Sequence, residues 1–343
     1  MKKSDDFFQN ILRLTNGKSQ PNLHPLMMRV RQLDALAMSV KYFGYELART
    51  LSDNLPKTPA QPPTFIGLCS KPSTQDDLAS SWVATWCEAL HVPVVFHRKL
   101  WEYCYVLQAL FDHGALRSGA RGLGFGCGHE PLPSYFASLG IDVLVTDLDP
   151  GEASARGWLS SAQHATDLGI AHKPHLVARD EFNKRCSLRY VDMNNIPDDL
   201  VGFDFCWSIC SLEHLGSISR GMSFIENAMK TIKEGGVAVH TTEFNFMNDE
   251  ETIDNWPTVL FQRQHFLEIE RRLRDLGYDV APLDFNVGSK PLDRFIDTPP
   301  WLHDQSDYIR SQWGTDSMHI KLSIDGFVCT CFGLIIKKSH PAA

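Results

Sequence analysis

The sequence predicts an α/β fold built on a mostly parallel sheet. From residue 120 onward, short apolar runs of strand type alternate with glycine turns and with stretches of helical periodicity. Strands and helices that alternate in this way form parallel sheets with right-handed crossovers. The runs that we expect to form strands span residues 123–125, 142–146, 187–190, 203–209, 236–241 and 327–336.

The N-terminal part of the chain has a different pattern. Pro25 suits the first turn of a helix, and apolar residues at helical spacing follow it as far as Leu47. Such a stripe fits either a dimer face or packing against the chain's own domain. The proline-dense loop NLPKTPAQPPT then marks a boundary. We expect a helical extension at 1–95, as a lid or dimerisation module, and a sheet domain at 96–343 with substrate-side insertions around 245–315.

The composition argues against several classes of protein. With 343 residues, of which 43% are hydrophobic, the chain is too apolar to be disordered. A formal net charge of −8 argues against a protein that coats nucleic acid. No apolar stretch suits a spanning helix, and MKKSDDFFQN lacks the apolar region of a secretory signal. Nine cysteines without paired spacing indicate neither a disulfide framework nor a metal site, and they favour a reducing compartment, the cytoplasm.

A glycine-rich turn follows the first predicted strand of the sheet domain. Gly126 and Gly128 let the backbone bend sharply and leave room for a ligand against the main chain. Asp147 ends the second strand, nineteen residues after Gly128, where a carboxylate can accept hydrogen bonds from both hydroxyls of a ribose. A nicotinamide-binding fold would show a similar turn, but this one lacks a full G-x-G-x-x-G in register.

Three later segments distinguish between these alternatives. Asp192 and Met193 follow the third strand, FDFCWSICSLEHL forms the fourth strand and its exit, and MKTIKEGGVAVHTTEF gives a helix, a turn and a fifth strand. In this order the chain resembles the class I S-adenosylmethionine-dependent methyltransferases over about residues 100–340. Segments such as GFGCGHEPLP and LDRFID are similar to uncharacterised bacterial methyltransferases of polysaccharide or secondary-metabolite clusters. The resemblance implies a Rossmann-like seven-stranded sheet, S-adenosylmethionine as cofactor, and methyltransferase activity.

The first motif departs from the family pattern at two positions. Gly124 stands where the family has an acidic residue, and Glu130 occupies the third glycine position. Either Glu130 takes over the missing acid's contact with the methionine amino group, or the cofactor pocket is altered. The cofactor-binding residues that the resemblance implies are Gly126, Cys127, Gly128, Glu130, Asp147, Leu148, Asp192, Met193 and Ser208, with the segment from Ser208 to Ser211 under the sulfonium.

Catalysis on a hydroxyl acceptor needs a group that takes its proton. His214 is the first candidate for this base, Glu243 the second, and Glu213 lies beside His214. Glu213, His214, Glu243 and His265 are also residue types that ligate a divalent cation. Small-RNA 2′-O-methyltransferases use a similar cluster, but Cys210 stands where their first Glu is expected.

The substrate side is expected in the insertions. Arg294 and Trp301 in KPLDRFIDTPPWLHD, together with His265, suit a polyhydroxylated acceptor that is held by hydrogen bonds and stacking. A salt-bridged structural loop is the alternative. The favoured function is O-methylation of a sugar, a glycoconjugate precursor or another small hydroxyl acceptor. A non-catalytic cofactor-binding partner and a metal-dependent RNA 2′-O-methyltransferase are the alternatives. A homodimer through the N-terminal helices is a separate expectation.

Overall fold

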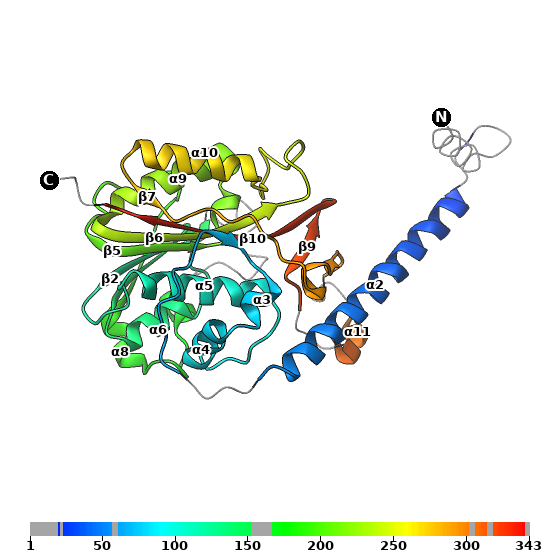
Figure 1. Ribbon diagram of the computed structural model, residues 1–343, viewed down its shortest axis with the longest axis horizontal. Coiled ribbons are helices and arrows are strands. Elements are labelled where there is room, and N and C mark those ends of the chain that lie inside the picture. Colours follow the sequence, from blue (N-terminus) through cyan, green and yellow to red (C-terminus); the bar gives the residue numbers. More distant parts are fainter. Residues whose placement is uncertain are drawn as a thin grey trace.

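The structure is a computed structural model that describes residues 20, 23–56, 61–151, 167–301, 306–313 and 318–339. Figure 1 shows one twisted sheet with helices on both faces and a long N-terminal helix that extends away from them. The predicted α/β class and methyltransferase-like sheet are confirmed.

The sheet has the strand order β4-β3-β2-β5-β6-β10-β9-β8. Strands β2 to β6 pair in parallel, and β10 is antiparallel to both β6 and β9. The chain runs outward from β2 in one direction and from its neighbour β5 in the other, so their carboxyl ends form a topological switch point, where ligands of open α/β sheets bind. The strands are β1 (Lys71–Pro72), β2 (Arg121–Phe125), β3 (Asp142–Asp147), β4 (Cys186–Tyr190), β5 (Phe203–Ile209), β6 (Ile232–Asn245), β7 (Asp279–Val280), β8 (Ile296–Asp297), β9 (Lys321–Ile324) and β10 (Phe327–Lys337).

Alternating side chains of the central strands build two hydrophobic cores, one on each face of the sheet. On β5, Phe205 and Trp207 belong to one core and Cys206 to the other, as the two-residue period of a strand requires. Helices α4, α5, α6 and α8 cover the first face, and α9 and α10 cover the second (Figure 1). The helices are α2 (Leu23–Asp53), α3 (Gln75–Leu78), α4 (Ser81–Ala89), α5 (Arg98–Asp112), α6 (Leu132–Ser138), α8 (Arg179–Arg185), α9 (Ile218–Thr231), α10 (Arg263–Asp275) and α11 (Asp307–Trp313), with short 3₁₀ turns at Leu168–Ala171, Leu212–His214 and Pro291–Asp293.

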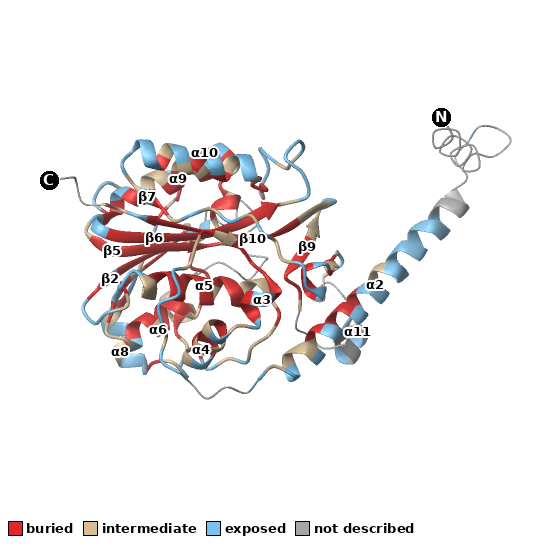
Figure 2. Ribbon diagram, viewed as in Figure 1, coloured by how far each residue is buried: buried red, intermediate tan, exposed pale blue. Residues whose placement is uncertain are grey.

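Helix α2 is attached to the body through its C-terminal half only. Asp297 of β8 is the anchor, because it forms a buried ion pair with Lys41 and accepts a hydrogen bond of 2.7 Å from the Tyr45 hydroxyl. Figure 2 shows the rest of the helix as mostly exposed. The first core contains Trp86 as well as Trp101, so residues on both sides of the predicted boundary at 95 share one core, and that division stays a prediction. In the described part of the chain, no helix combines the length and apolar character that crossing a bilayer requires.

Candidate active site

A cavity of about 300 Å³ opens at the switch point between β2 and β5. Gly126 and Gly128 have positive φ angles of 60° and 48°, a conformation that side chains other than glycine rarely adopt. A Cβ at Gly126 would lie 2.8 Å from the Cβ of Ser211, so both the backbone conformation and the close packing of the turn after β2 favour glycine. The residues that line the cavity are Lys99, Tyr103, Gly126, Cys127, Gly128, His129, Glu130, Asp147, Leu148, Val191, Asp192, Met193, Ile209, Cys210, Ser211, His214 and Leu215.

Two carboxylates in the cavity wall come from the carboxyl ends of β3 and β4. Asp147 ends β3, and its carboxylate accepts hydrogen bonds from the backbone N–H of Gly128 at 3.2 Å and of Leu148 at 2.9 Å. These bonds fix the carboxylate beside the glycine turn. Asp192 accepts a hydrogen bond from the backbone N–H of Asn194 at 2.9 Å, and Met193 lies next to it. The structure therefore brings the predicted cofactor residues of three loops to one cavity.

The departure at Gly124 has a steric cause. Gly124 of β2 lies opposite Trp207 of β5, and a Cβ there would stand 2.4 Å from the Trp207 ring and 2.3 Å from the Cys127 sulfur. The indole Nε1–H of Trp207 donates a hydrogen bond of 2.9 Å to the carboxyl group of Glu130. Burial raises the pKa of Glu130 to about 8. An acidic side chain at position 124 would have no space, whereas Glu130 places a carboxyl group in the cavity.

The exit of β5 supplies another part of the cavity wall. Ile209, Cys210 and Ser211 line it, but Ser208 does not. The Ser208 hydroxyl is fully buried and lies 2.8 Å from Nδ1 of His240. Ser208 therefore belongs to the core, and the rest of the predicted segment 208–211 forms part of the cavity wall. Burial lowers the pKa of His240 to about 3, so His240 is a neutral core residue.

His214 is the one predicted catalytic residue that lines the cavity. Its Nδ1 lies 3.0 Å from the carbonyl oxygen of Pro257, and a carbonyl only accepts, so we assign the ring proton to Nδ1 and the basic lone pair to Nε2. Thr258 places its hydroxyl 3.1 Å from the same Nδ1. Burial lowers the pKa of His214 to about 4. The ring is therefore neutral at physiological pH, with its basic nitrogen fixed.

Glu213 and Glu243 lie behind the cavity in a buried polar cluster. Glu243 of β6 forms an ion pair with Arg98 of α5, and Glu213 accepts a hydrogen bond of 3.2 Å from the Thr242 hydroxyl. Burial, reinforced by the charge of Glu243, raises the pKa of Glu213 to about 8. Neither glutamate lines the cavity, so their predicted catalytic roles have less structural support than that of His214.

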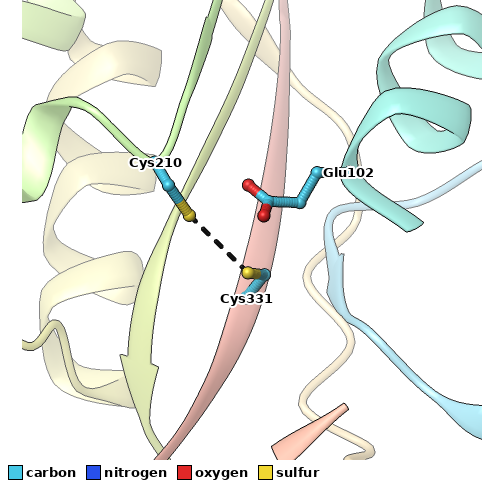
Figure 3. A group of neighbouring side chains, drawn as sticks. All are labelled: Glu102, Cys210 and Cys331. Atoms are coloured by element: carbon cyan, nitrogen blue, oxygen red, sulfur yellow. Dashed lines mark hydrogen bonds between the residues drawn. The ribbon is translucent and has the colours of Figure 1, made fainter. Parts of the chain in front are cut away.

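The same cluster contains two cysteines and a third glutamate. Figure 3 shows Cys210 and Cys331 facing each other, with sulfurs 3.6 Å apart, and Glu102 beside them. Among the described residues, the groups close enough to share a metal ion are Glu102 with Cys210 and Cys331, and Cys210 with Glu213 and Glu243. His214 and His265 belong to neither group, so the metal set of the RNA-methyltransferase alternative is not assembled. Arg98 and Lys99 supply positive charge to the cluster, because they pair with Glu243 and Glu102.

The three predicted substrate residues do not line the cavity. Arg294 is exposed. Trp301 lies 5.8 Å from the His319 ring, between ring centres. His265 caps α10, because its Nδ1 accepts a hydrogen bond of 2.9 Å from the backbone N–H of Gln262. The helix cap accounts for His265, and the structure gives none of the three a contact with the cavity.

Sequence reasoning missed Lys99 as a cavity residue. In the structure Lys99 and Tyr103 line the cavity, whereas Trp101 is fully buried and donates a hydrogen bond of 2.9 Å to Asp77. The signal was the four-residue spacing of Lys99 and Tyr103, which puts both on one face of a helix.

Comparisons with known proteins give similarities of fold. No family model matches the chain, and no curated protein matches it. Solved structures that align with this chain include the 4+2 cyclase SpnF, at 15% identity and a TM-score of 0.44. The alignment covers 80% of this chain and 100% of SpnF. A S-adenosylmethionine-dependent methyltransferase from Clostridium acetobutylicum has 11% identity and a TM-score of 0.36, over 68% and 89% of the chains.

A third similar structure is the magnesium protoporphyrin IX methyltransferase ChlM from Synechocystis with bound S-adenosylhomocysteine, at 11% identity and a TM-score of 0.38, over 67% and 80% of the chains. This chain's own sheet has five parallel strands, a reversed β10 between β6 and β9, and a cavity at the switch point. This chain has the fold of the class I S-adenosylmethionine-dependent methyltransferases.

Proposed function

We propose that this chain is an S-adenosylmethionine-dependent methyltransferase that methylates a hydroxyl group of a small or glycan-like acceptor. The observation that carries the proposal is one cavity that holds two carboxylates suited to a nucleoside, Asp147 and Asp192, together with a fixed neutral imidazole, His214. The donor set fits S-adenosylmethionine: a carboxylate for the ribose, apolar Leu148 and Met193 for the adenine, and glycine backbone beside the methionine chain.

When bound, the cofactor would supply an electrophilic methyl carbon, which the acceptor oxygen attacks in line while the carbon–sulfur bond breaks and S-adenosylhomocysteine leaves. The chain's own contribution is then position and proton removal, because alignment supplies much of the rate of such a step. Cys210 and Ser211 form the cavity wall at the exit of β5. His214 offers its Nε2 lone pair to the proton of the acceptor hydroxyl and becomes the imidazolium, while the acceptor oxygen takes the methyl group.

The acceptor class rests on two considerations. A neutral imidazole with a defined basic nitrogen suits a hydroxyl, whose proton must leave as the new bond forms. The resemblance of sequence segments to bacterial methyltransferases of polysaccharide or secondary-metabolite clusters favours a sugar or glycoconjugate precursor as the acceptor. The nine free cysteines favour the cytoplasm as the compartment of the protein. Arg294 and Trp301 remain candidates for acceptor contacts that form outside the cavity.

The test compares the affinity of purified wild type and variants for S-adenosylhomocysteine. Titration calorimetry with S-adenosylhomocysteine is expected to show binding to the wild type and a loss of at least about tenfold in affinity for Asp147→Ala, since each charge-assisted hydrogen bond is worth about 1.5–3 kcal/mol. Asp167→Ala, in the exposed cap of a 3₁₀ turn, is the matched control. An Asp147→Ala variant with wild-type affinity would count against the assignment.

A second candidate function is a non-catalytic cofactor-binding partner, and the altered first motif favours it. Gly124 and Glu130 change the part of the pocket that holds the methionine end. Cofactor turnover with a panel of sugars, nucleotide sugars and phenols separates the two functions. Binding without methyl transfer to any of them supports the partner, and transfer to one of them supports the enzyme.

We also propose a homodimer through α2. Leu33, Leu36, Val40, Phe43 and Leu47 alternate in steps of three and four residues, and each of them is exposed. This spacing is the seam pattern by which two helices pack along each other. The opposite side of the helix holds Lys41 and Tyr45 against the chain's own body, so the exposed seam faces away from it. A second copy offers an identical seam, as a twofold interface requires.

A further inference from the structure

We propose that Lys99 and Glu130 form a charge clamp for the amino-acid end of the cofactor, with the Lys99 ammonium on its carboxylate and the Glu130 carboxylate on its ammonium. The inference rests on the proposed cofactor and adds to it the residue that binds the cofactor carboxylate. Both side chains line the same cavity. Lys99 comes from α5, before the first strand of the methyltransferase core, and Glu130 follows the glycine turn after β2.

The distribution of charge in the cavity leads to this pairing. Of the described residues that line it, Lys99 is the one lysine or arginine, and the acids are Glu130, Asp147 and Asp192. Asp147 ends β3 and Asp192 follows β4, and the proposed function assigns both to the nucleoside. The amino-acid end of S-adenosylmethionine carries one positive and one negative charge, and Glu130 and Lys99 are the remaining pair of opposite charges.

Each group is held in place by a second residue. The Trp207 indole donates to one oxygen of Glu130 at 2.9 Å, which orients the carboxyl group. The Lys99 ammonium lies 3.1 Å from Glu102 of the same helix. An ammonium has three donors, so this contact leaves donors for a carboxylate. About one third of the Lys99 side chain is exposed, which allows a ligand to reach it.

The charge states agree with a proton-linked clamp. Burial raises the pKa of Glu130 to about 8, and the Lys99 charge opposes that rise. Burial acts to lower the pKa of Lys99, but the neighbouring acidic groups outweigh it, so the pKa of Lys99 is raised and its ammonium stays charged. The titratable groups that face Glu130 are Lys99, Glu102 and Tyr103 from α5, Asp147 from β3, and Cys127 from its own loop.

This charge state predicts the direction of a pH effect. Below about pH 8 the free protein holds a proton on Glu130, and an ammonium ligand favours the carboxylate, so binding releases that proton. At pH 7 the release is about 0.9 proton per ligand. Affinity for the cofactor is therefore expected to tighten about tenfold from pH 6 to pH 7 and to level off above pH 8.

The experiment is a comparison of two ligands by titration calorimetry. S-Adenosylhomocysteine carries the amino-acid group, and methylthioadenosine keeps the nucleoside and sulfur but lacks that group. We expect Lys99→Met and Glu130→Gln each to weaken S-adenosylhomocysteine binding by about tenfold or more and methylthioadenosine binding by less than about twofold. Lys184→Met and Glu234→Gln, at exposed side chains, are the matched controls. Binding of methylthioadenosine also shows that each variant is folded.

Proton release gives a second readout that a purely structural role would not change. Titrations in buffers of different ionisation enthalpy at pH 7 are expected to show release with S-adenosylhomocysteine in the wild type, and none with methylthioadenosine or with Glu130→Gln. Equal losses for both ligands in a variant, or release that persists in Glu130→Gln, would overturn the clamp. If the wild type binds neither ligand, the proposed cofactor fails; if it binds S-adenosylhomocysteine and the variants bind it equally well, only the clamp fails.

Discussion

A methyl group added at Gly124 tests the steric account of the altered first motif. In Gly124→Ala the Cβ would lie 2.3 Å from the Cys127 sulfur and 2.4 Å from the Trp207 ring, whereas nonbonded atoms pack at about 3.5–4.0 Å. One or more groups must therefore move by about 1 Å, and both neighbours are fully buried. Overpacking of this kind costs about 1–3 kcal/mol, which corresponds to roughly 2–4 °C of melting temperature per kcal/mol in a large domain.

The assay is thermal and urea unfolding of the ligand-free protein, followed by calorimetry with S-adenosylhomocysteine. Movement of Trp207 would disturb its hydrogen bond to Glu130, so a loss of affinity is expected together with the loss of stability. The double variant with Cys127→Ala removes one of the two clashes and is expected to be more stable than the sum of the single effects. A glycine-to-alanine change without strain stabilises a protein, so an unchanged or higher melting temperature in Gly124→Ala would refute the account.

Three further predictions concern the base, a buried acid and the exposed helix. His214→Gln is expected to lower kcat by about 10²–10⁴-fold with the cofactor Kd unchanged, and an unchanged kcat would remove its role as the base. Because burial raises the pKa of Glu213 to about 8 in the folded state, above its unfolded value, its contribution to stability is complete below about pH 4.5 and is lost as the pH rises through 8. Urea unfolding at several pH values should therefore show a stability loss over this window that is smaller in Glu213→Gln; an equal loss would contradict the buried acid. Leu36→Glu and Phe43→Glu are expected to give monomers by light scattering, while Ala35→Glu, outside the seam, stays dimeric; a wild type that is monomeric at all concentrations would refute the α2 interface.

The fold was largely predictable because its strands carry a strong local signal. Short apolar runs between glycine turns predicted the positions of β2, β3, β4, β5 and β10. The sequence predicted that this strand starts at residue 236, but β6 begins at Ile232. The register between β5 and β6 shifts between Phe203 and Phe205. The turn predicted before residue 236 is therefore an irregularity within the strand. A local pattern does not show such an irregularity, because it depends on the neighbouring strand.

The candidate site was predictable where it depends on backbone position and less so where it depends on packing. Gly126, Gly128 and Asp147 were expected at strand ends, and the structure places them in one cavity. Ser208 and His240 also belong to strands near the cavity, but they contact each other in the core, because a strand alternates its side chains between two faces. The relation between Gly124, Trp207 and Glu130 joins three segments of the chain and needs three-dimensional structure to be seen.

Two consecutive residues of α5, Arg98 and Lys99, connect the cavity with the β8–β9 edge of the sheet. Arg98 forms an ion pair with Glu243 of β6, and its backbone N–H donates a hydrogen bond of 3.0 Å to the carbonyl of His319, just before β9. The Nδ1 of His319 lies 2.7 Å from Asp297, the residue that anchors α2. The next residue, Lys99, lines the cavity. These contacts form one continuous series from Asp297, the anchor of α2, to Lys99 in the cavity wall. If the seam of α2 pairs two copies, the dimer interface lies at the far end of this series of contacts from the cavity.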